Sequence, residues 1–392
     1  MGRGQPAIFL TVFLDLLGFG MVIPLMPLIA EEFHASGLQI GLLAASFSLM
    51  QFFFNPFWGR LSDRIGRRPV LLVSIGGSVL SMALFGFANS LWTLFAARLL
   101  AGAAGANIST AQAYMADISA PEDRARAMGK VGMALGLGFV LGPVFGGLLS
   151  RYGRGTPAFV ASALSAVAWL WVLFFLRESR PEGGARAVRR AFDPGQWRSA
   201  LGTPHTALPI LLFFVVTFGF SGLEMAFSLF AKNRLAFTKL EIGTTFAFVG
   251  LVMAGTQGLL LGPLQRRFGE RRLSFAGVLL LAVGTASLPV CAPHVVLRAI
   301  GIAMVSVGVG INTPSLSSLV SRAALVDEQG GVLGVHHSMA SLARATGPFF
   351  AGFMYDAVGP SAPFLSGGAI IALGWVALAF PLLRLPPLPA PK

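Results

Sequence analysis

Four ionisable residues lie well inside long apolar segments of this 392-residue chain, where their side chains could do chemistry. Asp15 and Glu224 are the acids, and Arg98 and Arg344 are the bases. A charge in apolar surroundings is costly unless it is paired or hydrated, so each residue marks a candidate site. Burial also favours the neutral form of a carboxyl group, which lets a partly buried acid bind and release a proton. Asp15 is therefore the first candidate for a proton carrier.

Each of the four residues also has an alternative role. Asp15 could pair with a helix terminus or with Arg98. Glu224 could bind a cationic substrate, carry a proton, or lie in water near the end of its segment. Arg98 keeps its charge at any accessible pH, so it could hold a nearby carboxylate ionised until a proton or ligand intervenes. Arg344 could bind an anionic group or belong to a buried ion pair.

Polar residues in or near the apolar segments could line a binding cavity, or could simply form hydrogen bonds between helices. The candidates are Gln51, Asn55, Asn107, Gln112, Glu224, Gln257, Asn312, His337 and Arg344. His337 could titrate near neutral pH. The sequence has no recognisable metal-ligand cluster, catalytic triad or phosphate-binding Gly-Lys-Ser/Thr loop. We therefore expect no catalytic residue, no metal site and no cofactor.

The elements that position these residues are predicted to be membrane-spanning helices. Apolar residues make up 55% of the chain and charged residues only 11%, against about 25% charged residues in soluble domains. The apolar runs show no strand-like alternation, which favours helices over the strands of a membrane barrel. Twelve runs lie near residues 7–30, 38–58, 70–89, 91–116, 127–150, 156–176, 207–231, 241–264, 273–292, 295–320, 331–355 and 362–383.

The net charge of +13 predicts an orientation rather than a nucleic-acid partner. With the N-terminus in the cytoplasm, 21 of the 29 Lys and Arg residues fall on the inner side and five on the outer side. Short loops rich in Lys and Arg stay in the cytoplasm. We expect both termini there, with residues 7–30 as an uncleaved first span.

An internal repeat divides the chain into two halves. The basic segment 59–69, which we expect to be a loop between two spans, recurs as 262–272. Gly142-Pro143 recurs as Gly347-Pro348, and Asn107 matches Asn312. The offsets all lie between 203 and 205 residues, which makes chance recurrence in a glycine-rich chain a poor explanation. We predict six spans in residues 1–176, a cytoplasmic linker over 177–206, and six spans in residues 207–392. Parallel halves around a midplane site are typical of rocker-type transporters.

Several of these segments resemble the major facilitator superfamily. Residues 59–69 are similar to its signature between spans two and three, and residues 138–147 resemble the motif of its proton-coupled antiporters. Residues 15–27 resemble the twelve-span drug/proton antiporter branch, and residues 98–102 with 113–118 resemble bacterial tetracycline-type exporters. The resemblance implies an all-α integral membrane protein with twelve transmembrane helices in two pseudo-symmetric six-helix halves.

The resemblance assigns the charged segment to a conformational latch between the halves. Its residues are Gly59, Asp63, Arg64, Gly66, Arg67, Arg68 and Asp117. Asp63 could pair with Arg67 or accept hydrogen bonds from a helix N-terminus, and Arg67 is implied to meet Asp117. The basic residues could alternatively be topology anchors only. Because Arg266 stands where the second copy should have its acid, we expect a latch in the first copy alone.

Small residues at helical spacing mark the fifth span as a closely packed helix. They are Gly138, Gly142, Pro143, Gly146 and Gly147. Glycines four residues apart share one helix face and let backbones approach closely, and Pro143 removes a helix hydrogen bond. The resemblance implies that this helix lies between the halves and limits leakage.

These features together predict a secondary active transporter of the cell inner membrane. We expect proton-coupled antiport that exports small lipophilic or amphipathic compounds, with Asp15, Arg98 and Glu224 coupling proton binding to alternating access. The expected partners are the substrate, protons and lipid, without nucleic acid, and the expected state is a monomer. The alternatives are a transporter of the same fold for a sugar, siderophore or lysolipid, and a non-transporting membrane receptor.

Overall fold

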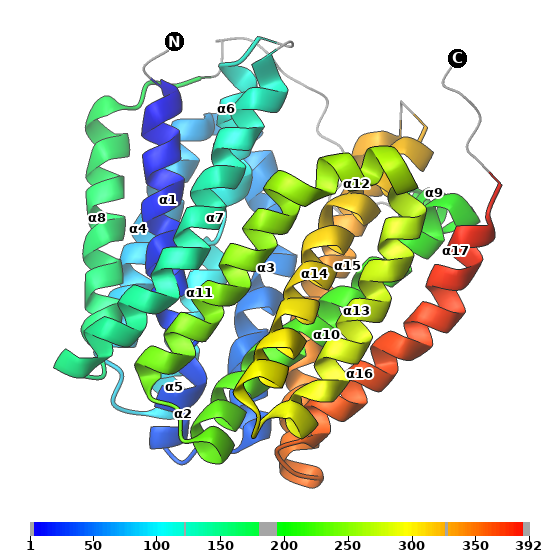
Figure 1. The fold of residues 1–392 in the computed structure, drawn as a ribbon. Coiled ribbons are helices and arrows are strands. Elements are labelled where there is room, and N and C mark those ends of the chain that lie inside the picture. The colour runs from blue at the N-terminus through cyan, green and yellow to red at the C-terminus, as the bar shows by residue number, and fades with distance from the viewer. Residues whose placement is uncertain (1–3, 121–122, 180–193, 326–327, 387–392) are drawn as a thin grey trace. The chain divides into compact units, whose positions relative to one another are not determined.

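The computed structural model describes residues 4–120, 123–179, 194–325 and 328–386, and every regular element in these ranges is helical (Figure 1). Among the described residues, eleven helical segments are long and apolar enough to cross a membrane. The twelfth predicted span, 331–355, corresponds to α15 (Gln329–Ala357), which is long enough but less apolar because it contains His336, His337 and Arg344. The expected all-α membrane fold is confirmed.

The first six predicted spans are formed by α1 to α8. They are α1 (Gly4–Val22) with α2 (Met26–Glu32), α3 (Gly37–Ile65), α4 (Arg67–Gly86), α5 (Leu91–Ala104) with α6 (Asn107–Asp117), α7 (Arg124–Leu149) and α8 (Thr156–Phe175). Two of these spans are interrupted near Pro24 and at Gly105. Proline lacks the N–H that a continuous helix needs, and glycine tolerates the conformations of a break.

The last six predicted spans are formed by α10 to α17. They are α10 (Pro204–Leu235), α11 (Lys239–Gly255) with α12 (Leu261–Phe268), α13 (Glu270–Cys291), α14 (Val295–Ala323), α15, and α16 (Ala362–Gly374) with α17 (Phe380–Arg384). Single π-helical turns at Thr256–Leu260 and Trp375–Ala379 join the paired segments. In the predicted linker, residues 180–193 lie outside the described residues, and α9 (Pro194–Leu201) packs against α15 through Trp197 and Ala200.

The chain forms two compact units. Unit 1 comprises Met1–Ala35, Ser46–Ala191 and Ala231–Phe248, and unit 2 comprises Ser36–Ala45, Phe192–Phe230 and Val249–Lys392. Each unit includes a short segment from the other predicted half, so the boundaries of those halves stay a prediction. Within unit 1, α4 packs against α5 and α8, and within unit 2, α13 packs in the same way against α14 and α16.

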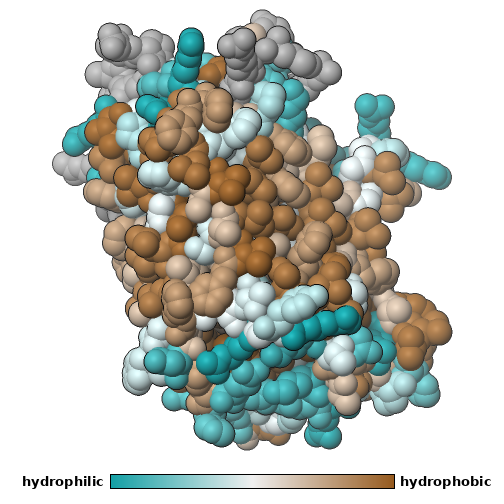
Figure 2. All heavy atoms as spheres, turned by 90° about the vertical axis from the view of Figure 1, so that its left-hand side faces the viewer, coloured by the Kyte–Doolittle hydropathy of each residue, from teal (hydrophilic) through white to brown (hydrophobic). Residues whose placement is uncertain are grey.

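Aliphatic side chains fill the interior of each unit. In unit 1, Ile8, Leu71, Met115 and Val172 belong to a core shared by α1, α4, α6, α7 and α8. In unit 2, α10, α13, α14 and α16 supply the corresponding core. Large apolar side chains also remain exposed on α4 and α8. Figure 2 shows one face where hydrophobic residues cover the middle and hydrophilic residues lie towards the ends, as a helix bundle in lipid requires.

Candidate functional site

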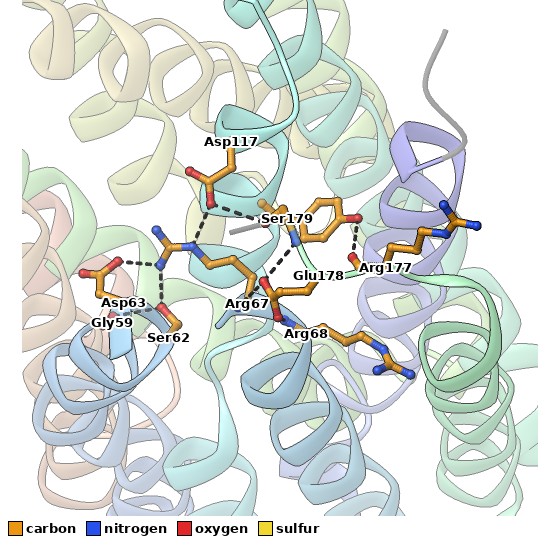
Figure 3. A network of polar contacts seen from close by, with 10 residues as sticks. Gly59, Ser62, Asp63, Arg67, Arg68, Asp117, Arg177, Glu178 and Ser179 are labelled. Atoms are coloured by element: carbon orange, nitrogen blue, oxygen red, sulfur yellow. Dashed lines mark hydrogen bonds and ion pairs between the residues drawn. The ribbon is translucent and has the colours of Figure 1, made fainter. Parts of the chain in front are cut away.

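Arg67 is the centre of a polar network at the junction of α3 and α4 (Figure 3). Its Nη1 atom lies 2.7 Å from Asp63 Oδ1, and its Nε atom lies 3.0 Å from Asp117 Oδ2. Nη1 also donates to Ser62 Oγ at 2.7 Å. The Arg67 side chain is only 13% exposed. The network therefore ties the end of α3, the start of α4 and the end of α6 to one buried guanidinium group.

The segment after α8 joins the same network, which the sequence did not indicate. Glu178 accepts hydrogen bonds from the backbone N–H groups of Arg67 and Arg68 at 2.9 and 3.0 Å (Figure 3). A carboxylate at a helix N-terminus satisfies orphan donors and complements the helix dipole. Tyr114 Oη donates to the Arg177 carbonyl at 2.8 Å. Glu178 stands 111 residues after Arg67, so no local pattern links them.

The charged segment is mostly helical, although the sequence suggested a loop. Helix α3 continues to Ile65 and α4 begins at Arg67, so Gly66 alone separates them. Its φ of 101° favours glycine, and a Cβ atom there would collide with Glu178. Gly59 lies in α3 with nothing within 4 Å of a Cβ position. Arg64 is exposed.

The second copy of this segment has the same geometry with inverted charges. Gly269, with φ of 76°, separates α12 from α13 as Gly66 separates α3 from α4. Glu270 follows Gly269 and lies 3.4 Å from Arg322 Nη2, the position that corresponds to Asp117. Ser318 Oγ also donates to Glu270 Oε1 at 2.6 Å. Reversal of both partners preserves the attraction in the second copy, while the expectation of a latch in the first copy alone stays a prediction.

The glycines of α7 permit close backbone contacts on two faces. A Cβ atom at Gly138 would lie 2.7 Å from Leu16 Cβ, and one at Gly142 would lie 2.7 Å from Gly20 Cα. At Gly146 it would collide with the Met21 carbonyl. The other face approaches α11, where a Cβ atom at Gly147 would lie 2.8 Å from Leu240 Cα, and the Pro143 carbonyl abuts Gly243. A larger residue at these positions would separate the helices.

Asp15 lies beside the break between α5 and α6. Asn107 Nδ2 donates to Asp15 Oδ2 at 2.8 Å and to Ser78 Oγ at 3.0 Å, and Ser78 also hydrogen-bonds Asp15. Asn107 is the first residue of α6, so a side chain at the start of that helix bonds Asp15. Both described partners of Asp15 are neutral, so its carboxyl group can change protonation state without breaking an ion pair.

The backbone at this break is satisfied by side chains from neighbouring helices. Ser74 Oγ on α4 donates to the Ala104 carbonyl and accepts from the Ala106 N–H at 3.0 Å. Trp58 Nε1 on α3 donates to the Ala103 carbonyl at 2.6 Å. Irregular backbone at membrane depth is stable only when its polar groups find such partners. These contacts hold the start of α6 in place beside α1.

Arg98 on α5 is 6% exposed and lies against aromatic rings. Its guanidinium carbon is 4.5 Å from the centroid of Phe47 and 5.7 Å from that of Phe19. An aromatic face stabilises a cation at this distance while excluding water. This arrangement brings Arg98 next to α1, the helix that contains Asp15.

A second group of ionisable residues lies in unit 2. Glu224 on α10 and Arg344 on α15 interact electrostatically, and Arg344 Nη2 donates to Ser341 Oγ at 3.1 Å. Helix contacts at Gly222 and Gly347 hold α10 and α15 together near this pair. The role of Arg344 stays a prediction.

His336 and His337 on α15 have different surroundings. His337 is exposed, whereas His336 is fully buried and its ring centroid is 4.3 Å from that of Phe213. Ser317 Oγ donates its hydrogen to the Thr313 carbonyl at 2.9 Å, so it accepts from His336 Nε2 at 3.1 Å. This fixes the proton of a neutral His336 ring on Nε2. The sequence signal, two adjacent histidines, could not separate the two environments.

The remaining cavity candidates differ in accessibility. Gln112 and Gln257 are exposed, and Gln51 and Asn55 are half-buried. Asn107 and Asn312 are buried instead, so they contact neighbouring helices in this structure. Asn312 Nδ2 donates to the Gly308 carbonyl at 2.8 Å. Asn107 thus forms hydrogen bonds between helices, whereas Asn312 forms one within α14.

The whole chain is similar to known membrane transporters and resistance proteins. Tetracycline resistance protein, class C, of Escherichia coli is 34% identical over 351 residues, which cover 88% of each chain. Multidrug resistance protein 2 of Bacillus subtilis (strain 168) is 31% identical, with 93% of this chain and 91% of the relative covered. The crystal structure of the human organic anion transporter MFSD10 (TETRAN) superposes with a TM-score of 0.71 at 27% identity, and covers 97% of this chain and 99% of its own.

A family model described as Major Facilitator Superfamily matches residues 8–324 and 256–392. The two matches together extend over nearly the entire chain and overlap every helix described above. The multi-pass helical fold and the repeated α3–α4 and α12–α13 junctions agree with this match. The chain belongs to the Major Facilitator Superfamily, a family of transporters.

Proposed function

We propose that this transporter is a proton-coupled antiporter that exports small lipophilic or amphipathic compounds by alternating access. Asp15 is the proton-binding group. Arg98 and Glu224 couple the state of that group to the conformational change. The proposal is supported by the similarity to tetracycline and multidrug resistance proteins.

The observation that carries the proposal is the environment of Asp15. Its carboxyl group lies within a membrane span and is hydrogen-bonded by Asn107 and Ser78, both neutral. A carboxylate fixed by an ion pair would stay charged over a wide pH range. Without such a partner, its charge depends on access to water and protons, which is what alternating access changes.

The expected cycle uses the proton gradient as its energy source and needs no cofactor. One proton entering from outside is driven by about 2.3 kcal/mol for each 100 mV of membrane potential. Proton release from Asp15 on the inner side would restore the carboxylate before the next cargo molecule binds. We also propose a monomer in the cell inner membrane, with both termini in the cytoplasm and no nucleic-acid partner.

The proposal is tested with purified protein in proteoliposomes under an imposed pH gradient. Tetracycline and ethidium serve as probes, and a pH-sensitive dye in the lumen reports proton movement. We expect each mole of transported probe to be accompanied by proton flux in the opposite direction. Transport of a probe without any proton movement would exclude antiport.

The cargo class is tested in the same vesicles with a panel of other compounds. The alternatives are a sugar, a siderophore, a lysolipid or an organic anion, the last because of the similarity to an organic anion transporter. We expect lipophilic probes to compete with one another and sugars to have no effect. Saturable transport of one of the alternative classes with no transport of tetracycline or ethidium would contradict the proposed cargo.

A further inference from the structure

Asn107 makes two hydrogen bonds with one amide nitrogen. Nδ2 donates to Asp15 Oδ2 at 2.8 Å and to Ser78 Oγ at 3.0 Å. An ionised carboxylate can only accept, so the nitrogen of the amide must face it. Ser78 accepts from Asn107, which leaves its hydroxyl hydrogen available for Asp15. The orientations of the Asn107 amide and the Ser78 hydroxyl therefore both suit an ionised carboxylate at Asp15.

The other end of the same amide has no partner among the described residues. Asn107 Oδ1 is buried and makes no hydrogen bond, and the residue is only 6% exposed. A buried acceptor without a donor costs about 1–3 kcal/mol. Such a group needs a structural or functional explanation.

The position of the amide is fixed by the helix break. Ser74 bridges the Ala104 carbonyl and the Ala106 N–H, immediately before Asn107. The backbone before Asn107 is thereby held, while its amide can still rotate about the Cβ–Cγ bond. A half-turn about that bond exchanges Nδ2 and Oδ1 without moving α6.

We propose that Asn107 is a positioning residue that hydrogen-bonds the Asp15 carboxyl group in both of its protonation states. This inference rests on the proposed role of Asp15 as the proton-binding group. With Asp15 ionised, Nδ2 donates to the carboxylate as the structure shows. With Asp15 protonated, the new O–H donates to Asn107 Oδ1 after the half-turn. Ser78 then donates to the same oxygen, so the acceptor that lacks a partner now has two.

One proton is gained or lost between the states, the Asn107 amide and the Ser78 hydroxyl reorient, and no covalent bond of Asn107 changes. Protonation therefore changes which atom of Asn107 links the helices. In the ionised state, the Asn107 nitrogen links α1 to α4 through Asp15 and Ser78. In the protonated state, the Asn107 oxygen forms both links, so Asp15 is held without a buried, unpaired charge.

The other ionisable groups on the elements around Asp15 do not replace this contact. On α7, Lys130 donates to Gln5 Oε1 at 2.7 Å, near the start of α1. Arg98 on α5 stacks on Phe47 and Phe19. Asp117 on α6 and Arg67 on α4 pair with each other at the far ends of those helices. Helix α8 has no ionisable residue.

The test measures the pH dependence of probe-driven proton release in proteoliposomes for Asn107→Ala and Asn107→Leu. Both variants remove a hydrogen bond from each form of Asp15, but the bond to the charged form is the stronger one, so Asp15 without Asn107 binds its proton more tightly. The pH of half-maximal proton release should therefore rise by about one unit. This size follows from the usual strength of a hydrogen bond to a charge. The Leu variant keeps the side-chain volume, so a packing defect in the Ala variant does not decide the result.

Asn312→Ala is the matched control. Asn312 occupies the corresponding position in unit 2, is fully buried, and bonds only a backbone carbonyl. We expect no shift of the half-maximal point for this variant. An equal shift in Asn312→Ala would overturn the inference, because any buried asparagine would then have the same effect.

Three further outcomes separate the inference from the proposed function. If Asp15→Asn abolishes probe-driven proton release but neither Asn107 variant shifts the pH dependence, the inference is wrong and the proposed function stands. If Asp15→Asn releases protons as the unmodified protein does, the proposed function and the inference both fail. If Asp15→Asn abolishes release and both Asn107 variants shift as expected, the inference is supported.

Discussion

Gly66 is the residue whose replacement should disturb the α3–α4 junction most directly. Its φ of 101° is unfavourable for any residue with a Cβ atom, and Glu178 occupies the space beside it. We predict that Gly66→Ala lowers the free energy of unfolding by about 1–3 kcal/mol. Thermal unfolding in detergent measures this change.

Gly59→Ala is the control from the same motif. Gly59 lies inside α3, where nothing is within 4 Å of a Cβ position. Alanine is favoured over glycine in a helix by about 0.5–1 kcal/mol, so this variant should be unchanged or slightly more stable. Equal loss of stability in both variants would mean that the motif depends on glycine for a reason other than local geometry.

At the scale of elements, α7 depends on glycine for its contacts with α1. We predict that Gly146→Val reduces transport and the melting temperature, because its side chain would collide with the Met21 carbonyl and separate the helices. Gly136→Val, on the same helix, has open space around its Cβ position and should retain both. Transport of tetracycline in proteoliposomes and thermal unfolding check the pair. Full activity of Gly146→Val would contradict the packing argument.

The charge-inverted junction gives a second prediction at this scale. Double-mutant cycles with Glu270→Gln and Arg322→Gln should give a favourable coupling of about 0.5 kcal/mol, small because Arg322 is 68% exposed and solvent screens the pair. The cycle with Arg67→Gln and Asp117→Asn should give a larger coupling, since Arg67 is 13% exposed. Zero coupling at Glu270 would show that the second junction shares the backbone geometry of the first but has no stabilising ion pair.

At the scale of the whole molecule, the orientation can be tested at the two ends of α14. Replacement of the single cysteine, Cys291, by serine gives a background without thiols. We predict that His294→Cys reacts with a membrane-impermeant maleimide in intact cells, whereas Leu325→Cys reacts only after lysis. Both positions are exposed, so accessibility does not bias the comparison. The reverse pattern would place both termini outside.

The sequence predicted the helical class and the span positions well because hydropathy reports directly on contact with lipid. It could not place the helix break at Gly105, since Ser74 and Trp58 satisfy that backbone from other helices. Partners distant in sequence were missed for the same reason, as with Glu178. The charge motif was assigned to a loop because charged residues end a hydropathy run, although the helix itself continues to Ile65.

The central claim is that the Asp15 carboxyl group binds the transported proton, and one measurement tests it most directly. Purified Asp15→Asn in proteoliposomes is compared with the unmodified protein for proton flux driven by a tetracycline gradient. The amide has nearly the same size as the carboxyl group and cannot bind a proton at accessible pH. We predict that tetracycline-driven proton flux is lost while tetracycline binding persists. Undiminished proton flux in Asp15→Asn would contradict the account.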